Sequence, residues 1–98
     1  MEDRIRNINL YDYYYLLLTD KQQTYFEEYY FNNLSLQEIS ELYSVSRNAI
    51  YKTIKDVCLK LEEYENNLKL YEKGQKLKKI IDEVDDEELK GRLSDILW

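Results

Sequence analysis

The sequence predicts an all-α protein: a helix-turn-helix bundle, followed by a long helix and a C-terminal helical extension. Three observations predict this fold. The 98 residues include no proline and only two glycines, whereas turn-rich β folds need more of both. Apolar residues recur at steps of three and four. Two segments also have the form of a capping box, which marks the start of a helix.

Spacing and capping predict three helices in the N-terminal half. Residues 4–18 carry apolar side chains at helical intervals, and Thr19–Gln22 has the capping-box form that opens a second helix. That helix ends at Asn32-Asn33, and a second capping box, Ser35–Glu38, opens a short third helix. The side chains expected to face the core are Ile5, Ile8, Tyr11, Tyr15 and Leu18, then Tyr25, Phe26, Tyr29 and Tyr30, then Ile39, Leu42 and Tyr43.

The helical spacing of the 11 tyrosines favours core packing over stacking on nucleic-acid bases. Tyr13 and Tyr14 fall outside the apolar side of the first helix, so we expect them to be exposed or at an interface. The single cysteine, Cys58, is expected to be a buried apolar residue rather than a reactive thiol.

A three-residue turn, Ser44-Val45-Ser46, joins the short helix to a long one that Ser46 caps. The long helix carries apolar residues at alternating steps of four and three, typical of a coiled coil, and is expected to end at Gly74. We divide the chain into a helix-turn-helix domain, residues 1–62, and a helical extension, residues 63–98, with the long helix continuous between them. A last helix is expected after a cap formed by Asp85 with Glu88.

The second half of the long helix extends beyond what the N-terminal bundle can cover. Its seam residues are Leu61, Tyr64, Leu68 and Tyr71. They are expected to pack either against the remaining chain in a hairpin or against a second copy, and we favour a homodimer.

The chain is acidic, with a net charge of −6, but residues 47–60 carry four basic residues and one acidic residue. In a helix-turn-helix protein this helix enters the DNA groove, where its first residues reach base edges and its lysines hold phosphates. The candidate nucleic-acid-binding residues are Arg47, Asn48, Tyr51, Lys52 and Lys55. The alternative is that they form only the solvated side of an amphipathic helix.

A second basic stretch, residues 69–79, has five lysines against one glutamate. Its lysines are Lys69, Lys73, Lys76, Lys78 and Lys79. One interpretation is a contact for RNA phosphates or for an acidic protein surface. The other is a polar junction between helices, in which the lysines serve capping and solubility.

Several function classes find no support. With one cysteine and no histidine, a zinc site would need carboxylates alone. We find no glycine-rich phosphate loop and no nucleophile motif. No apolar run approaches the roughly 20 residues that cross a bilayer, and charges interrupt the N-terminal apolar stretch. We therefore expect a cytoplasmic protein with no catalytic activity, cofactor, metal site, small-molecule substrate or membrane insertion.

Residues 18–65 resemble region 4 of the bacterial sigma factors, a helix-turn-helix that contacts promoter DNA. A closer resemblance, to the YlxM family, spans about residues 8–80. It rests on "YDYYYLLLT", the "KQ" pair, "YYFNNLSLQEISELYSVSRNAIY" and "LEEYENNLKLYEK". YlxM proteins are small bacterial helix-turn-helix proteins associated with the signal recognition particle genes. The resemblance implies an accessory or regulatory role in that pathway, with the particle's protein or RNA as partner.

Two positions depart from the general helix-turn-helix pattern. Ser44 stands where a glycine with positive φ is usual, and Ser40 where a small alanine packs. Both serines are small enough for the fold, although a left-handed Ser44 would cost about 1 kcal/mol. The preferred function is the pathway accessory. The alternatives are a dimeric DNA-binding transcription regulator, which reads with the helix from Ser46, and an interaction module that binds no nucleic acid.

Overall fold

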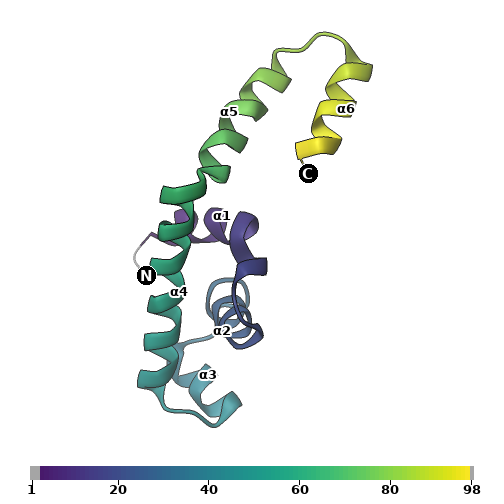
Figure 1. Ribbon diagram of the computed structural model, residues 1–98. Coiled ribbons are helices and arrows are strands. Elements are labelled where there is room, and N and C mark those ends of the chain that lie inside the picture. Colours follow the sequence, from purple (N-terminus) through teal and green to yellow (C-terminus); the bar gives the residue numbers. More distant parts are fainter. Residues whose placement is uncertain (1–2, 98) are drawn as a thin grey trace.

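The computed structural model describes residues 3–97, which are all-α as predicted, with no strand among them (Figure 1). The elements are α1 (Arg4–Tyr14), the 3-10 helix η1 (Tyr15–Leu17), α2 (Asp20–Tyr30), α3 (Leu36–Tyr43), α4 (Arg47–Leu68), α5 (Leu70–Asp82) and α6 (Glu87–Leu97). The outer limits of the two predicted domains, residues 1 and 98, lie outside the described range.

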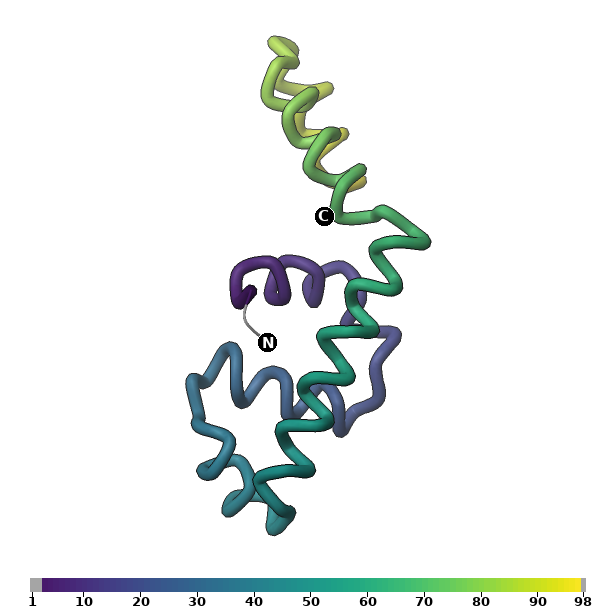
Figure 2. The backbone as a smooth tube through the Cα atoms, turned by 90° about the vertical axis from the view of Figure 1, so that its left-hand side faces the viewer, coloured from purple at the N-terminus to yellow at the C-terminus, as the bar shows by residue number. Residues whose placement is uncertain are grey.

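Helix α4 is the central helix of the bundle, and α1, α2 and α3 all pack against it (Figure 2). The core residues are Leu10, Tyr11, Tyr14, Leu18, Tyr25, Phe26, Tyr30, Ile39, Ile50, Ile54, Val57, Cys58 and Leu61. Most tyrosines pack in or against this core, as predicted, and the rings of Tyr11 and Phe26 stack with centroids 4.2 Å apart. The predicted burial of Cys58 is also confirmed.

Both predicted capping boxes are present. The Thr19 hydroxyl accepts a hydrogen bond from the Gln22 backbone N–H, and the Gln22 side chain accepts one from the Thr19 N–H. Ser35 and Glu38 make the same reciprocal pair at the start of α3. These bonds satisfy N–H groups that have no partner within the helix, so the starts of α2 and α3 follow from local sequence.

The predicted orientation of the first helix is partly wrong. Helix α1 ends at Tyr14 rather than Leu18, and Ile5 and Tyr15 are exposed, whereas Tyr14 is fully buried. Helix α1 is apolar on two sides, so spacing alone does not identify the buried one. The side that is buried carries Tyr14, whose hydroxyl lies 2.5 Å from the buried Glu65 carboxylate. Tyr13, also expected outside, is half-buried against the core. On α3, Leu42 and Tyr43 are likewise exposed rather than buried.

The long helix is interrupted by an elbow. Helix α4 runs across residues 62 and 63 but ends at Leu68, and Lys69 takes a left-handed conformation with φ 56° before α5 begins. The prediction that Gly74 ends the helix is therefore wrong. Gly74 lies inside α5, where a Cβ atom would come within 2.2 Å of the Tyr13 hydroxyl oxygen. The glycine thus allows α5 to approach α1 closely.

The buried Glu65 holds this elbow. Its carboxylate accepts hydrogen bonds from the Tyr14 hydroxyl and from the backbone N–H groups of Tyr71 and Glu72, at 2.5, 3.1 and 3.0 Å. The Tyr14 hydroxyl accepts another from the Leu70 N–H. Side chains of α1 and α4 therefore cap the first turn of α5, which has no capping side chain of its own.

The C-terminal segment folds back on α5 to make a helical hairpin that extends from the bundle (Figure 1). Asp86, rather than the predicted Asp85, caps α6 by accepting from the N–H groups of Glu88 and Leu89. Asp86 is the residue directly before the helix, where a side-chain oxygen reaches those groups. No helix within the described chain is long and apolar enough to span a bilayer.

Candidate nucleic-acid interface

The turn between α3 and α4 is built without glycine. Ser44 ends α3 in a left-handed conformation, with φ 56° and ψ 42°, and its N–H bonds to the Ser40 carbonyl. The Ser40 hydroxyl donates to the Val45 carbonyl at 2.5 Å, so serine replaces alanine here with a bond to the turn. Ser46 then caps α4 by accepting from the Ala49 N–H, as predicted. The strain at Ser44, about 1 kcal/mol, is opposed by these bonds.

One side of α4 carries the candidate binding residues. Its buried side contains Ile50, Ile54 and Val57, each 0% exposed. All five candidates lie outside this side and are exposed: Arg47, Asn48, Tyr51, Lys52 and Lys55. We call these five residues the α4 basic face.

The cations of the α4 basic face have no acidic partner among residues 3–97. Among the residues that the structure describes, ion pairs join Arg6 to Glu62 and Lys76 to Glu72, and none involves this face. Leu59 lies eleven residues after Asn48, which is about 20° around the helix at 100° per residue, and its side chain is also exposed. The sequence reasoning missed Leu59, although the same helical wheel places it beside the lysines.

The neighbouring helix α3 is acidic. Hydrogen bonds from Ser35, first from its backbone, hold the pKa of Glu38 below its usual value, so this carboxylate stays ionised at neutral pH. Glu41, one turn later, accepts from Gln37. These two carboxylates lie with Leu34 and Leu42 around a shallow depression along α3. Of these two helices, only α4 presents exposed cations.

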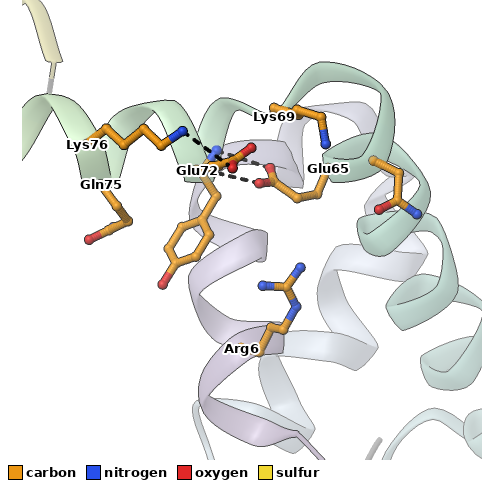
Figure 3. Close-up of a pocket in the computed structure, with 8 residues that line it drawn as sticks. Arg6, Glu65, Lys69, Glu72, Gln75 and Lys76 are labelled. Atoms are coloured by element: carbon orange, nitrogen blue, oxygen red, sulfur yellow. Dashed lines mark hydrogen bonds and ion pairs between the residues drawn. The ribbon is translucent and has the colours of Figure 1, made fainter.

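The second basic stretch extends from the elbow along α5. Lys69 and Lys76 line a pocket of about 460 Å³ at the elbow, with Arg6, Glu65 and Glu72 around them (Figure 3). Lys76 forms an ion pair with Glu72 at 3.6 Å, so part of its charge is neutralised.

The remaining lysines of this stretch point in different directions. Lys78 is half-buried and lines a second pocket with Ser94 and Leu97 of α6. Lys73 and Lys79 are exposed on α5. Unlike the α4 basic face, this stretch holds one of its lysines, Lys76, in an ion pair.

The four seam residues lie mostly against α1 of the same chain. Leu61 is fully buried in the core, and the Tyr64 ring lies 5.9 Å from that of Tyr14. The Tyr71 ring meets Tyr13 edge-on at the same distance, and only Leu68 is exposed. Helix α1 of the same chain therefore covers the first part of this seam, where the sequence predicted either the C-terminal hairpin or a second copy.

Arg6, Tyr14 and Glu65 of the elbow were missed by the sequence reasoning. Arg6 donates two hydrogen bonds to the Glu62 carboxylate, at 2.6 and 3.0 Å. Burial raises the pKa of Glu65, but the bonds from Tyr14 and from two backbone N–H groups outweigh it and lower the pKa overall. The partners lie 51 or more residues apart in sequence, so no local signal marks them.

The α4 basic face suits ligand binding, whereas the single thiol of the chain is buried. Cys58 lies 3.6 Å from the Tyr30 hydroxyl, and burial raises the pKa of its thiol, which keeps it protonated. Within residues 3–97, no group of three or more metal-ligating side chains comes together. The α4 basic face instead presents fixed cations and a tyrosine ring, which suit phosphates and bases.

Residues 1–96 match the model of the UPF0122 family, described as "Putative helix-turn-helix protein, YlxM / p13 like". A UPF0122 protein of Oceanobacillus iheyensis is 46% identical over 86% of this chain and 81% of its own length. One from Geobacillus sp. is 44% identical over 88% of this chain and 78% of its own length. One from Ureaplasma urealyticum is 45% identical over 91% of this chain and 90% of its own length. The chain belongs to the UPF0122 family of YlxM / p13-like helix-turn-helix proteins.

Proposed function

We propose that this protein is a non-catalytic accessory protein of the signal recognition particle pathway that binds the particle's RNA through the α4 basic face. The pathway is what the resemblance to the YlxM family implies. The observation that supports a nucleic-acid ligand is the set of exposed cations on α4, Arg47, Lys52 and Lys55, none of which pairs with an acidic side chain in the described chain.

The charge distribution favours RNA over long duplex DNA. Duplex affinity grows with the number of phosphates neutralised across a broad footprint, and here only one helix supplies the cations. At the start of α3, where a helix-turn-helix protein often holds a phosphate, the Glu38 carboxylate already accepts from Ser35. A folded RNA loop presents phosphates and unstacked bases over a smaller surface, which one helix can contact.

The test is fluorescence anisotropy with three labelled ligands: signal recognition particle RNA, the particle's GTPase, and random-sequence duplex DNA. Each is titrated at about 50 and about 200 mM salt, because phosphate contacts weaken steeply across this range. We expect binding to the RNA that weakens with salt, and little binding to the duplex.

A pair of charge-matched variants locates the surface. Lys52→Glu with Lys55→Glu reverses two charges on the α4 basic face. Lys21→Glu with Lys60→Glu reverses two exposed lysines elsewhere, since Lys60 lies about 120° around α4 from Asn48. We expect the first double variant to abolish RNA binding and the second to lower affinity only modestly.

Other outcomes point to other functions. Tight, salt-sensitive binding to duplex DNA would identify a DNA-binding transcription regulator that reads with α4. Binding to the GTPase alone would make the particle's protein the partner. If neither double variant changes binding to any of the three ligands, the helix-turn-helix serves only as an interaction module and the proposal fails.

A further inference from the structure

The α5–α6 hairpin buries too little apolar surface to explain why its two helices are stable. Helix α6 has 11 residues, contacts α5 and has no fully buried residue. Helices of this length are marginal in water unless an apolar side is buried. The molecule is also elongated, 53 by 25 by 22 Å, because the hairpin stands away from the bundle (Figure 1).

The exposed apolar side chains of the hairpin gather on one side. Ile80 is 58% exposed and lies about 100° from the buried Ile81, on one flank of α5. Leu89 and Ile96, 42% and 81% exposed, are seven residues apart and share one flank of α6. Antiparallel helices turn in opposite senses along a common axis, so these two flanks lie on the same side of the hairpin.

This side forms a continuous strip. Ile80 and Leu89 lie near the turn between the helices, and Ile96 lies near the elbow. Leu77 and Leu93, both half-buried, fall between the two flanks. We call these five residues the hairpin strip. A strip of this kind is where a third helix packs in a helical bundle.

The two ends of the hairpin carry opposite net charges. The tip, residues 83–88, holds five acidic residues and no basic one. The base, residues 69–76 at the start of α5 with residues 92–97 of α6, holds four basic residues (Lys69, Lys73, Lys76 and Arg92) and two acidic ones (Glu72 and Asp95), a net charge of +2. A surface that is acidic at one end and basic at the other is complementary to itself when turned by 180°.

We propose that a second copy of this chain docks on the hairpin strip in antiparallel orientation, with the acidic tip of each hairpin beside the basic base of the other. The two strips then close a four-helix bundle around a two-fold axis. A parallel arrangement would instead bring the two acidic tips together. The dimer interface is therefore the hairpin strip rather than the four seam residues on α4 and α5, most of which α1 covers.

The test is the mass of the full-length chain in solution, measured by light scattering after size exclusion over a range of concentrations. We expect about twice the 12.0 kDa of one chain. Leu89→Glu and Ile96→Glu are expected to reduce the mass to one chain. The matched controls are Ile5→Glu and Leu16→Glu, since both side chains are at least 75% exposed but lie outside the hairpin, and both should leave the dimer intact. Circular dichroism of each variant establishes that it is folded.

A charge-exchange experiment tests the orientation. Lys73→Glu with Lys76→Glu makes the base acidic, and Asp85→Lys with Glu88→Lys makes the tip basic. Each double variant alone should dimerise more weakly, and mixing the two should restore a dimer. A monomeric wild-type chain, a dimer broken by the Ile5 and Leu16 controls but not by the strip variants, or no recovery on mixing would each overturn the proposal. None of these measurements involves RNA, so their outcome is independent of the proposed function.

Discussion

Replacing Glu65 by glutamine should cost far more stability than one side-chain charge on a helix normally does. The Glu65 carboxylate is buried and accepts three hydrogen bonds, one from Tyr14 and two from backbone N–H groups at the start of α5. A glutamine amide keeps one acceptor oxygen and places N–H donors against at least one of these donors. The change therefore leaves a buried donor without an acceptor.

The magnitude follows from those bonds. A hydrogen bond to a charged group contributes about 1.5–3 kcal/mol, and a buried unsatisfied donor costs about 1–3 kcal/mol. We expect the free energy of unfolding to fall by about 2–4 kcal/mol, or roughly 10–25 °C in Tm for a domain of this size. Glu63→Gln is the matched control: Glu63 is exposed on the same helix, and its replacement should change stability by less than about 0.5 kcal/mol.

The assay is urea unfolding followed by circular dichroism, for wild type, Glu65→Gln and Glu63→Gln at several pH values. The folded-state pKa of Glu65 is lowered, so its stabilising effect is present above the pKa of the unfolded chain and is lost as the pH falls. The gap between wild type and Glu65→Gln should accordingly narrow on acidification. Equal stability of the two at neutral pH would refute the account of the elbow.

Three further predictions follow from the geometry. Gly74→Ala should destabilise the chain, because the new Cβ would meet the Tyr13 hydroxyl, whereas Gly91→Ala should stabilise it by about 0.5–1 kcal/mol, since nothing lies within 4 Å of the new methyl. Thermal unfolding of both variants checks this, and equal effects on Tm would contradict it. Ser44→Gly should raise stability by about 0.5–1 kcal/mol by relieving the left-handed serine, and a loss on urea unfolding would argue against the strain. Cys58 should react slowly with a disulfide reagent at pH 8 and rapidly in denaturant, whereas fast native labelling would show that it is not buried as described.

Local signals predicted the helix-turn-helix well. The two capping boxes, the Ser46 cap and the steps from Ile50 to Leu61 depend only on residues a few positions apart, and the structure confirms each of them. The exposed α4 basic face follows from the same wheel. Whether these residues bind nucleic acid stays a prediction, because exposure and charge are also properties of an ordinary solvated helix.

Features that depend on distant contacts were not predictable from the sequence. The apolar pattern runs through Leu61, Tyr64, Leu68 and Tyr71 without a break, although the helix ends at Leu68. The elbow after this helix is held by Glu65, whose carboxylate accepts a hydrogen bond from Tyr14, 51 positions earlier in the chain. The same contact lies on the side of α1 that is buried. A helix with leucines, isoleucines and tyrosines on two sides contains no local information on which of them meets the core.

The most direct test of the proposed function is the salt dependence of binding to signal recognition particle RNA. We compare wild type with Lys52→Gln, Lys55→Gln, which removes two charges without reversing them. If both lysines hold phosphates, the slope of log K against log salt should become shallower by roughly 1.4–1.8. An unchanged slope, or equal weakening by the Lys21→Gln, Lys60→Gln control, would contradict the assignment of the α4 basic face as the RNA-binding surface.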